Sequence, residues 1–292
     1  MRAHATAALI FFAIVGCTPS EPASSSEDLE FTVHAPLLGT DPTPLADTLS
    51  VPSADTVESD WFLILTEEVK TTHKETHFTS QVERRVRVRG TEDATGLTRF
   101  RLSEAQVFSA PSNPSWIAEN ATLMNDLQIT AKRTEQGMNI EFPDDLAPAI
   151  APHVRAVGLA LQMLIPPRLS AEVTPRTTWT MSAEAPATMK RTTRPLGTLP
   201  CGGSRCLALA SSIALSETVE SANDSGRVSA SGKGSGQAMA HIDIKTGIPV
   251  AMRMDYALNT DMTTRGENAH ASTLRQQKKL SATMRVKGDP AP

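Results

Sequence analysis

Aromatic side chains are scarce in this 292-residue sequence: they make up 4% of the chain, and Tyr256 is the single tyrosine. Proteins that bind single-stranded nucleic acid use aromatic side chains as stacking platforms for the bases. The formal net charge of −4 also gives the chain no basic excess of the kind that a phosphate backbone attracts. We therefore expect no nucleic-acid partner.

The sequence also lacks a catalytic or cofactor motif. It contains no Gly-X-Ser-X-Gly turn, which positions the nucleophile of many hydrolases. In GRVSASGKGSG (226–236), five residues separate Gly226 from Gly232 and a glycine follows Lys233, so the spacing does not fit a phosphate-binding loop. We predict a polar, glycine-rich turn or mobile loop at 223–236 instead. From these absences we expect neither enzymatic activity nor a cofactor.

Metal-binding patterns are equally sparse. The segment HKETH (73–77) places His73 and His77 four residues apart, but the order His-X-Glu-X-His matches neither the zincin motif nor its inverted form. On a strand, the two side chains would share a face at a separation of about 13 Å, too far for one ion. We therefore predict a solvated strand face and no metal site.

Cysteine occurs three times, and Cys17 ends an apolar run that spans residues 5–15. The run is far shorter than the roughly 20 residues that a membrane-spanning helix needs. Arg2 precedes the run, and Gly16 stands just before the cysteine. A positive start, a short apolar region and a small residue before a break are typical of a secretory signal peptide.

The residues IVGC (14–17) resemble the bacterial lipobox. This resemblance implies that residues 1–16 are a lipoprotein signal peptide and that Cys17 becomes an acylated N-terminus, because several acyl chains hold a domain at a bilayer more firmly than one. The alternative is an ordinary signal peptide with an incidental Cys17. Thr18 differs from the Asp that marks inner-membrane retention in enterobacteria, so the resemblance implies a lipid anchor in the bacterial cell envelope, at the outer membrane.

Residues 17–50 are rich in Pro, Ser, Thr, Asp and Glu. Such a composition buries too little apolar surface to fold by itself. We predict a lipidated Cys17 followed by a disordered acidic tether up to residue 50, and a β-rich envelope domain over 51–292.

The other two cysteines, Cys201 and Cys206, stand in LPCGGSRCLAL with two glycines between them. In an oxidising envelope this arrangement favours a local disulfide that closes a tight loop. Two alternatives remain: a redox-active pair, which usually has two intervening residues, and half of a metal site.

Most of the remaining chain alternates apolar and polar residues, with turn residues at 90–96, at 135–137 and at Thr246-Gly247. This period of two, together with the abundance of Val and Thr, predicts antiparallel strands. In ERRVRVR (83–89) the alternation places Arg85, Arg87 and Arg89 on one face. Such a face is either solvated or suited to anionic lipid headgroups.

One segment has the period of a helix instead. Its apolar residues recur in steps of three and four: Leu146, Ile150, Val154, Val157, Leu161 and Leu164. Pro166-Pro167 would end the helix, so we predict it at about 147–165. Many strands and one helix predict an α+β, mostly β fold, with a large curved antiparallel sheet or half-barrel and the helix packed on it.

This predicted topology resembles the lipoprotein-carrier (Lol-type) half-barrels and the mycobacterial glycolipid-binding lipoproteins. The hairpin AHIDIKTGIP (240–249) resembles one found in families of uncharacterised bacterial envelope lipoproteins. The resemblance covers the topology and that hairpin, and it assigns no ligand-binding residue.

Two roles follow for a protein held at the membrane by a lipid anchor. The first is a binding protein that shelters a lipid or acyl chain between sheet and helix, in a cavity beneath Ile150, Val154, Val157 and Leu161. The second is a structural or assembly protein that binds another envelope protein, which predicts a filled core and an exposed apolar patch.

Overall fold

The computed structural model describes residues 41–52, 57–93, 95–110, 121–134, 137–166, 169, 172–183, 188–201, 203–223, 226–265 and 272–286. The predicted signal peptide and Cys17 lie outside the described residues. No described helix is long and apolar enough to cross a membrane.

Eleven antiparallel strands form one large sheet. In spatial order they are β6 (Gly137–Glu141), β5 (Gln128–Thr134), β4 (Leu97–Ala110), β3 (Thr76–Glu92), β2 (Val57–His73), β13 (Ser272–Val286), β12 (Pro249–Arg265), β11 (Gly226–Asp243), β10 (Ser204–Asn223), β9 (Thr188–Cys201) and β8 (Trp179–Ala183). Two meanders, β2–β6 and β8–β13, join where β13 pairs with β2. The shorter elements are β1 (Leu49–Ser50), which pairs with β7 (Glu172–Val173), and the 3₁₀ helix η1 (Thr122–Met124).

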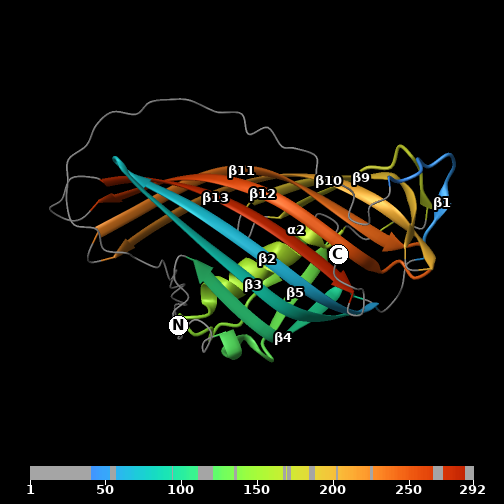
Figure 1. Ribbon diagram of the computed structural model, residues 1–292, viewed down its shortest axis with the longest axis horizontal. Helices are drawn as coiled ribbons and strands as arrows, with labels where there is room; N and C mark the ends of the chain where they lie inside the picture. Colours follow the sequence, from blue (N-terminus) through green and yellow to red (C-terminus); the bar gives the residue numbers. More distant parts are fainter. Residues whose placement is uncertain are drawn as a thin grey trace.

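The sheet curves into a half-barrel around the helix α2 (Ala151–Leu164), as Figure 1 shows. Its edge strands β6 and β8 approach each other, so the half-barrel is nearly closed there. The prediction of a mostly β fold with one main helix on a curved antiparallel sheet is confirmed. We call the end with the β2–β3, β10–β11 and β12–β13 turns the distal end, and the opposite end, with the β9–β10 turn, the proximal end.

The helix α2 is buried on almost all sides, with ten of its fourteen residues buried. Its apolar residues pack against the inner face of the sheet in one continuous core. The helix is shorter than predicted at its start, because Ala147–Ile150 form a turn in which the Ile150 amide donates to the Ala147 carbonyl. Pro152 lies in the first turn, where its missing N–H is tolerated.

A buried arginine satisfies the carboxyl end of α2. Arg191, from the inner face of β9, is fully buried, and its Nη1 donates to the carbonyl oxygens of Met163 and Ile165, each at 2.7 Å. Its Nε donates to the Ser211 hydroxyl at 3.0 Å. A cation is favourable here because the last carbonyls of a helix carry partial negative charge and lack intrahelical partners.

The glycine-rich segment 226–236 is a strand, so the prediction of a turn or loop at 223–236 is wrong for these residues. It forms the first part of β11 and pairs with β10 and β12 along its length. The glycines are required by packing, because a Cβ at Gly234 would collide with the ring and hydroxyl of Tyr256. An aromatic ring from the neighbouring strand thus covers the glycine.

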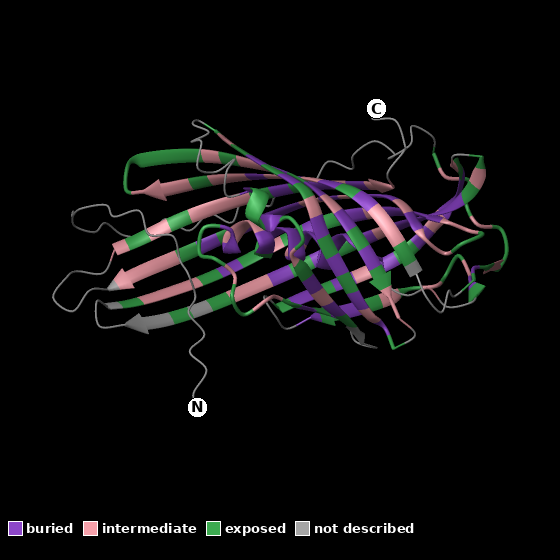
Figure 2. Cartoon of the chain, turned by 90° about the horizontal axis from the view of Figure 1, so that it is seen from below, coloured by how far each residue is buried: buried purple, intermediate pink, exposed green. Residues whose placement is uncertain are grey.

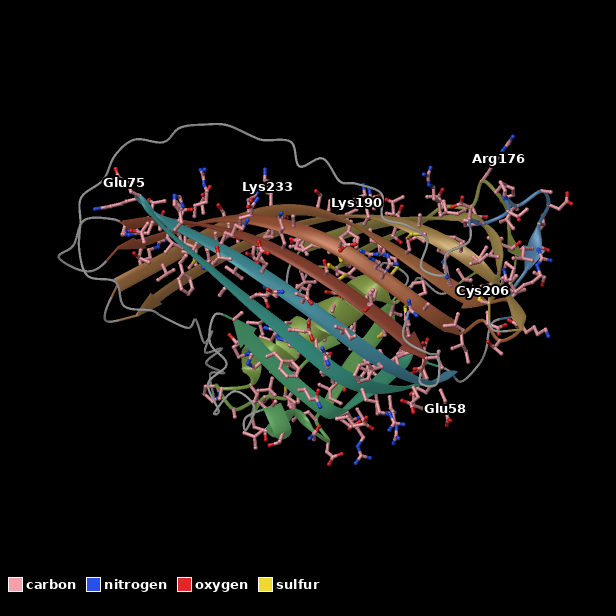
Figure 3. The ribbon with its side chains drawn as sticks, in the orientation of Figure 1. Glu58, Glu75, Arg176, Lys190, Cys206 and Lys233 are labelled. Carbon is pink, nitrogen blue, oxygen red and sulfur yellow. A yellow bond between two sulfur atoms is a disulfide. The ribbon has the colours of Figure 1, made fainter. Side chains whose placement is uncertain are left out.

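Residues 41–52 contact the proximal end of the sheet, although the sequence places most of them in the tether. Thr43 and Thr198 exchange two backbone hydrogen bonds of 2.8 Å, and Val51 is buried in the main core. Ordered pairing therefore extends back at least to Thr43. The disulfide Cys201–Cys206 is present at the β9–β10 turn, and Figure 3 shows Cys206 at the opposite end of the sheet from Glu75.

Replacing the arginine that caps α2 should destabilise the fold. In Arg191→Leu, the carbonyls of Met163 and Ile165 lose their charged donor inside the core, so we expect the free energy of unfolding to fall by about 2–4 kcal/mol. Arg194→Leu, at an exposed position of the same strand, is the matched control and should change stability by less than about 0.5 kcal/mol. Equal stability of the two variants in urea denaturation would contradict the capping role.

Candidate functional site

The inner face of the sheet changes character along its strands. The pairing registers align inward-pointing residues into rows across β3, β2, β13, β12, β11 and β10. One row in the main core is entirely apolar and fully buried: Val86, Leu63, Met284, Met252, Ala240 and Leu209. The equivalent row three positions nearer the distal end contains Lys278 and Gly234, and its residues are in part only half-buried. The inner face is thus fully buried beside the helix and less buried toward the distal end.

The inner face continues on the distal side of Tyr256, and we call this part the distal concave face. Its apolar side chains are Val69, Phe78, Leu215, Leu258, Met262 and Leu274. Phe78 is 55% exposed although it points to the same side of the sheet as core residues. Figure 2 shows the same gradient, with buried residues where the strands pass α2 and half-buried or exposed ones toward the strand ends. Apolar side chains are therefore presented to solvent on the concave side.

Among the described residues, the distal end is also open along one side, because the flanking strands are short. β5 pairs with β4 only at Leu97–Arg101, and β8 pairs with β9 only at Met189–Thr193. β9 in turn stops pairing with β10 at Ser216. In the described part of the chain, β10 is therefore an edge of the sheet from Glu217 onward. No described strand covers the distal concave face on that side.

A charged cluster lies at the boundary between the main core and the distal concave face. Glu67 Oε2 is 2.8 Å from Arg84 Nη1, and Glu67 Oε1 is 2.5 Å from Lys278 Nζ. Arg84 also donates from Nε to Nδ1 of His153, in the first turn of α2, at 3.1 Å. The cluster therefore attaches the start of α2 to β2, β3 and β13.

The titration of this cluster reflects burial and charge together. Burial alone would raise the pKa of Glu67, but the charges of Lys278 and Arg84 outweigh it and lower the pKa to about 2. Burial and the charge of Arg84 lower the pKa of His153 to about 4. At neutral pH, His153 is therefore an uncharged acceptor for Arg84, and Glu67 is an anion with two cationic partners.

The residues predicted to line a ligand cavity all lie in the main core. Ile150, Val154, Val157 and Leu161 are between 0% and 3% exposed and pack with the sheet. They face the closed part of the half-barrel. That they line a cavity stays a prediction.

The other polar segments singled out in the sequence have structural roles. The prediction of a strand face for HKETH is wrong at Lys74-Glu75, which form the β2–β3 turn with Lys74 at φ 55°. His73, the last residue of β2, has its Nε2 3.0 Å from the Ser272 hydroxyl. Among the described residues, no group of three His, Cys, Asp or Glu side chains could hold a metal ion. Of the outward-facing arginines, Arg85 pairs with Glu83 and Arg87 with Asp60 and Glu104.

The inward charges Glu67, Arg84 and Lys278 were missed in the sequence. A signal was present, because each interrupts the apolar side of an alternating strand: Glu67 follows Leu63 and Leu65, and Arg84 precedes Val86. A charge at an inward position of a strand indicates a partner inside the fold. The sequence does not show which strands lie adjacent, so it could not pair them.

No protein-family model matches the sequence, and no curated protein matches it. Among solved structures, the chain is similar to lipovitellin, with 7% identity and a TM-score of 0.43 over 82% of this chain, although the match spans only 26% of lipovitellin. It is similar to OccK2 of Pseudomonas aeruginosa, with 5% identity, a TM-score of 0.23, and 79% and 98% of the two chains covered. A DUF1329 family protein from Desulfovibrio piger has 7% identity, a TM-score of 0.16, and 80% and 88% coverage. Similarity this weak shows neither a shared family nor a shared function.

The lowered pKa of His153 makes the fold sensitive to acid. The folded protein holds this histidine neutral down to pH about 4, whereas the unfolded chain takes up the proton near pH 6.5. Stability is therefore full above about pH 6.5 and falls as the pH decreases toward 4, by about 1–2 kcal/mol for this partly buried group.

His153→Gln, which keeps an acceptor for Arg84, should flatten the decline between pH 6.5 and 4. His241, whose pKa is also lowered to about 4 by burial and by Arg285, should still contribute its share in that variant. His77→Gln, at an exposed position of the β2–β3 turn, is the control. Thermal unfolding across this pH range would refute the assignment if His153→Gln and wild type declined in parallel.

Proposed function

We propose that the protein is a lipid-anchored, non-catalytic binding protein of the bacterial cell envelope, which holds one amphiphile against the distal concave face. The observation that carries the proposal is that the inner face of the sheet continues past α2 as a partly exposed apolar surface with an open side. Contiguous exposed apolar surface on a soluble domain marks a binding site. Small-molecule sites are found in the mouths of β-barrels.

The shape favours an extended ligand with an apolar chain. The distal concave face spans several residues along each of six strands, and a strand rises about 3.3 Å per residue. A chain along the strands would contact Val69, Leu258 and Leu274 and end against α2. Burying about ten methylene groups contributes roughly 8 kcal/mol before the costs of association are subtracted.

In this proposal, the closed part of the half-barrel around α2 supports the binding surface. α2 and the core around Ile150 and Val154 close one end of the concave side. An alkyl chain on the sheet would therefore also contact this closed end. The charged cluster of Glu67, Arg84 and Lys278 holds the start of the helix in place. The predicted anchor at Cys17 would keep this site near the membrane from which an amphiphile is drawn.

The binding site is tested by placing a charge on the distal concave face. In the chain after Cys17, secreted with a cleavable signal, we expect a fluorescent long-chain alcohol to bind and to be displaced by unlabelled dodecanol. Leu274→Glu, which places a carboxylate at an inward position, should weaken binding at least tenfold, a loss of about 1.4 kcal/mol or more. Thr273→Glu, at the adjacent outward and exposed position, is the matched control. Equal affinities of the two variants would contradict the proposed surface.

The anchor is tested separately on the full-length protein. Cells fed labelled palmitate should incorporate the label into the wild-type chain and leave Cys17→Ser unlabelled, because the lipobox resemblance makes Cys17 the acylation site. The variant should also leave the membrane fraction. Label on Cys17→Ser, or an unlabelled wild type, would remove the lipid anchor from the proposal.

A further inference from the structure

Three polar side chains meet on the distal concave face above the glycines of β11. Glu217 reaches over from β10, and Thr260 and Tyr256 reach over from β12. A Cβ at Gly232 would lie 2.7 Å from the Thr260 hydroxyl and 3.1 Å from Glu217 Oε1, while a Cβ at Gly234 would collide with the Tyr256 hydroxyl. The missing side chains of β11 thus leave room for a small group of polar atoms, which we call the polar niche.

The niche is only partly satisfied by the protein. Thr260 donates to Glu217 Oε1 at 3.0 Å. The Tyr256 hydroxyl, on a residue that is 3% exposed, has no hydrogen-bond partner among the residues that the structure describes. Glu217 forms no ion pair with any cation among the described residues. An unpartnered hydroxyl in a buried position is unfavourable, so it indicates a group that the folded chain does not itself supply.

The polar niche carries negative charge only, from Glu217. Burial raises the pKa of Tyr256, and the negative charge of Glu217 raises it further, so the phenol remains neutral. The nearest inward cations on β3 and β13, Arg84 and Lys278, are occupied by Glu67. Glu217 would therefore repel an anionic ligand group, because Arg84 and Lys278 are already paired. A cationic group would instead lie beside the Glu217 carboxylate and be attracted to it.

Glu217 forms the outer rim of the niche, on the open side of the half-barrel, and the Tyr256 hydroxyl lies buried behind it. Glu217 is the first residue of β10 beyond its pairing with β9, and it is half-buried. The apolar side chains Leu215 and Leu258 lie in the neighbouring row, on either side of Gly234. A polar group in the niche can therefore be continuous with an alkyl chain on the distal concave face.

We propose that the polar niche of Glu217, Thr260 and Tyr256 binds the amino headgroup of a cationic amphiphile, a primary ammonium joined to an alkyl chain. The ammonium donates hydrogen bonds to the Glu217 carboxylate and to the Tyr256 hydroxyl oxygen. This inference rests on the proposed function, because the alkyl chain would occupy the distal concave face. It assigns the class of headgroup that the site selects.

The test compares three probes of equal chain length, dodecylamine, dodecanol and dodecanoate, by calorimetry, with the amine and the carboxylate below their micelle concentrations and the alcohol below its solubility limit. For the wild-type chain after Cys17, we expect the amine to bind at least tenfold more tightly than the alcohol and the carboxylate to bind most weakly. Glu217→Gln should reduce the affinity for the amine about tenfold and leave that for the alcohol unchanged, since only the amine loses a hydrogen bond between two charged groups. Ethylamine, which lacks the chain, should not bind detectably at the same concentrations.

Two further variants separate this role from a structural one. Tyr256→Phe removes an unpartnered hydroxyl, so it should retain the stability of the wild type while its preference for amine over alcohol decreases. Glu220→Gln, on the outer face of the same strand and paired with Arg227, should keep the wild-type preference and thereby control for attraction to a negatively charged protein.

The outcomes distinguish the inference from the proposed function. Binding of all three probes without preference, or a preference that Glu217→Gln leaves intact, would overturn the headgroup assignment while the amphiphile site stands. Binding of ethylamine as tight as dodecylamine would overturn the amphiphile and point to a free amine. If no probe binds the wild type, both the proposed function and this inference fail.

Discussion

α2 lies buried inside the half-barrel, and the sheet is arranged around it. Two arginines from opposite parts of the sheet contact the two ends of this helix. Arg191 of β9 donates to the carbonyls of the last turn, and Arg84 of β3 donates to His153 in the first turn. Because these contacts come from strands far apart in the sheet, they fix α2 across the concave side and hold the curvature of the sheet around it.

The position of α2 divides the concave side into two parts with different properties. Where α2 lies, the rows of inward side chains are apolar and closed. Toward the distal end the long strands β2, β3 and β10–β13 continue without it, and β5, β6, β8 and β9 end before them. The fold thus joins a rigid core to an open apolar surface, which is the arrangement that an amphiphile-binding protein needs.

Most of the architecture could be predicted from the sequence, because it is encoded in local periodicity. The alternation in 76–92 and 97–110 gave two long strands, and the steps of three and four after residue 146 gave the helix. The glycine-rich segment 226–236 was predicted as a turn or loop because of its composition, but the same composition also suits a strand whose neighbour carries an aromatic ring. Only the register that pairs Tyr256 with Gly236 shows that the segment is such a strand. The charges of Glu67, Arg84 and Lys278, and the niche around Glu217, depend on pairings between strands up to about two hundred residues apart, as between β2 and β13. No local pattern contains that information.

Native mass spectrometry can show whether the distal concave face holds an amphiphile in the native protein, as we propose. The chain after Cys17, secreted into a bacterial periplasm and purified without detergent, should carry an added mass that organic solvent releases and that fragments as a molecule with an alkyl chain. Leu274→Glu should lose that mass, while Thr273→Glu retains it. A wild-type protein that is folded, free of any added mass, and still free of it after incubation with bacterial lipid extract would contradict the account.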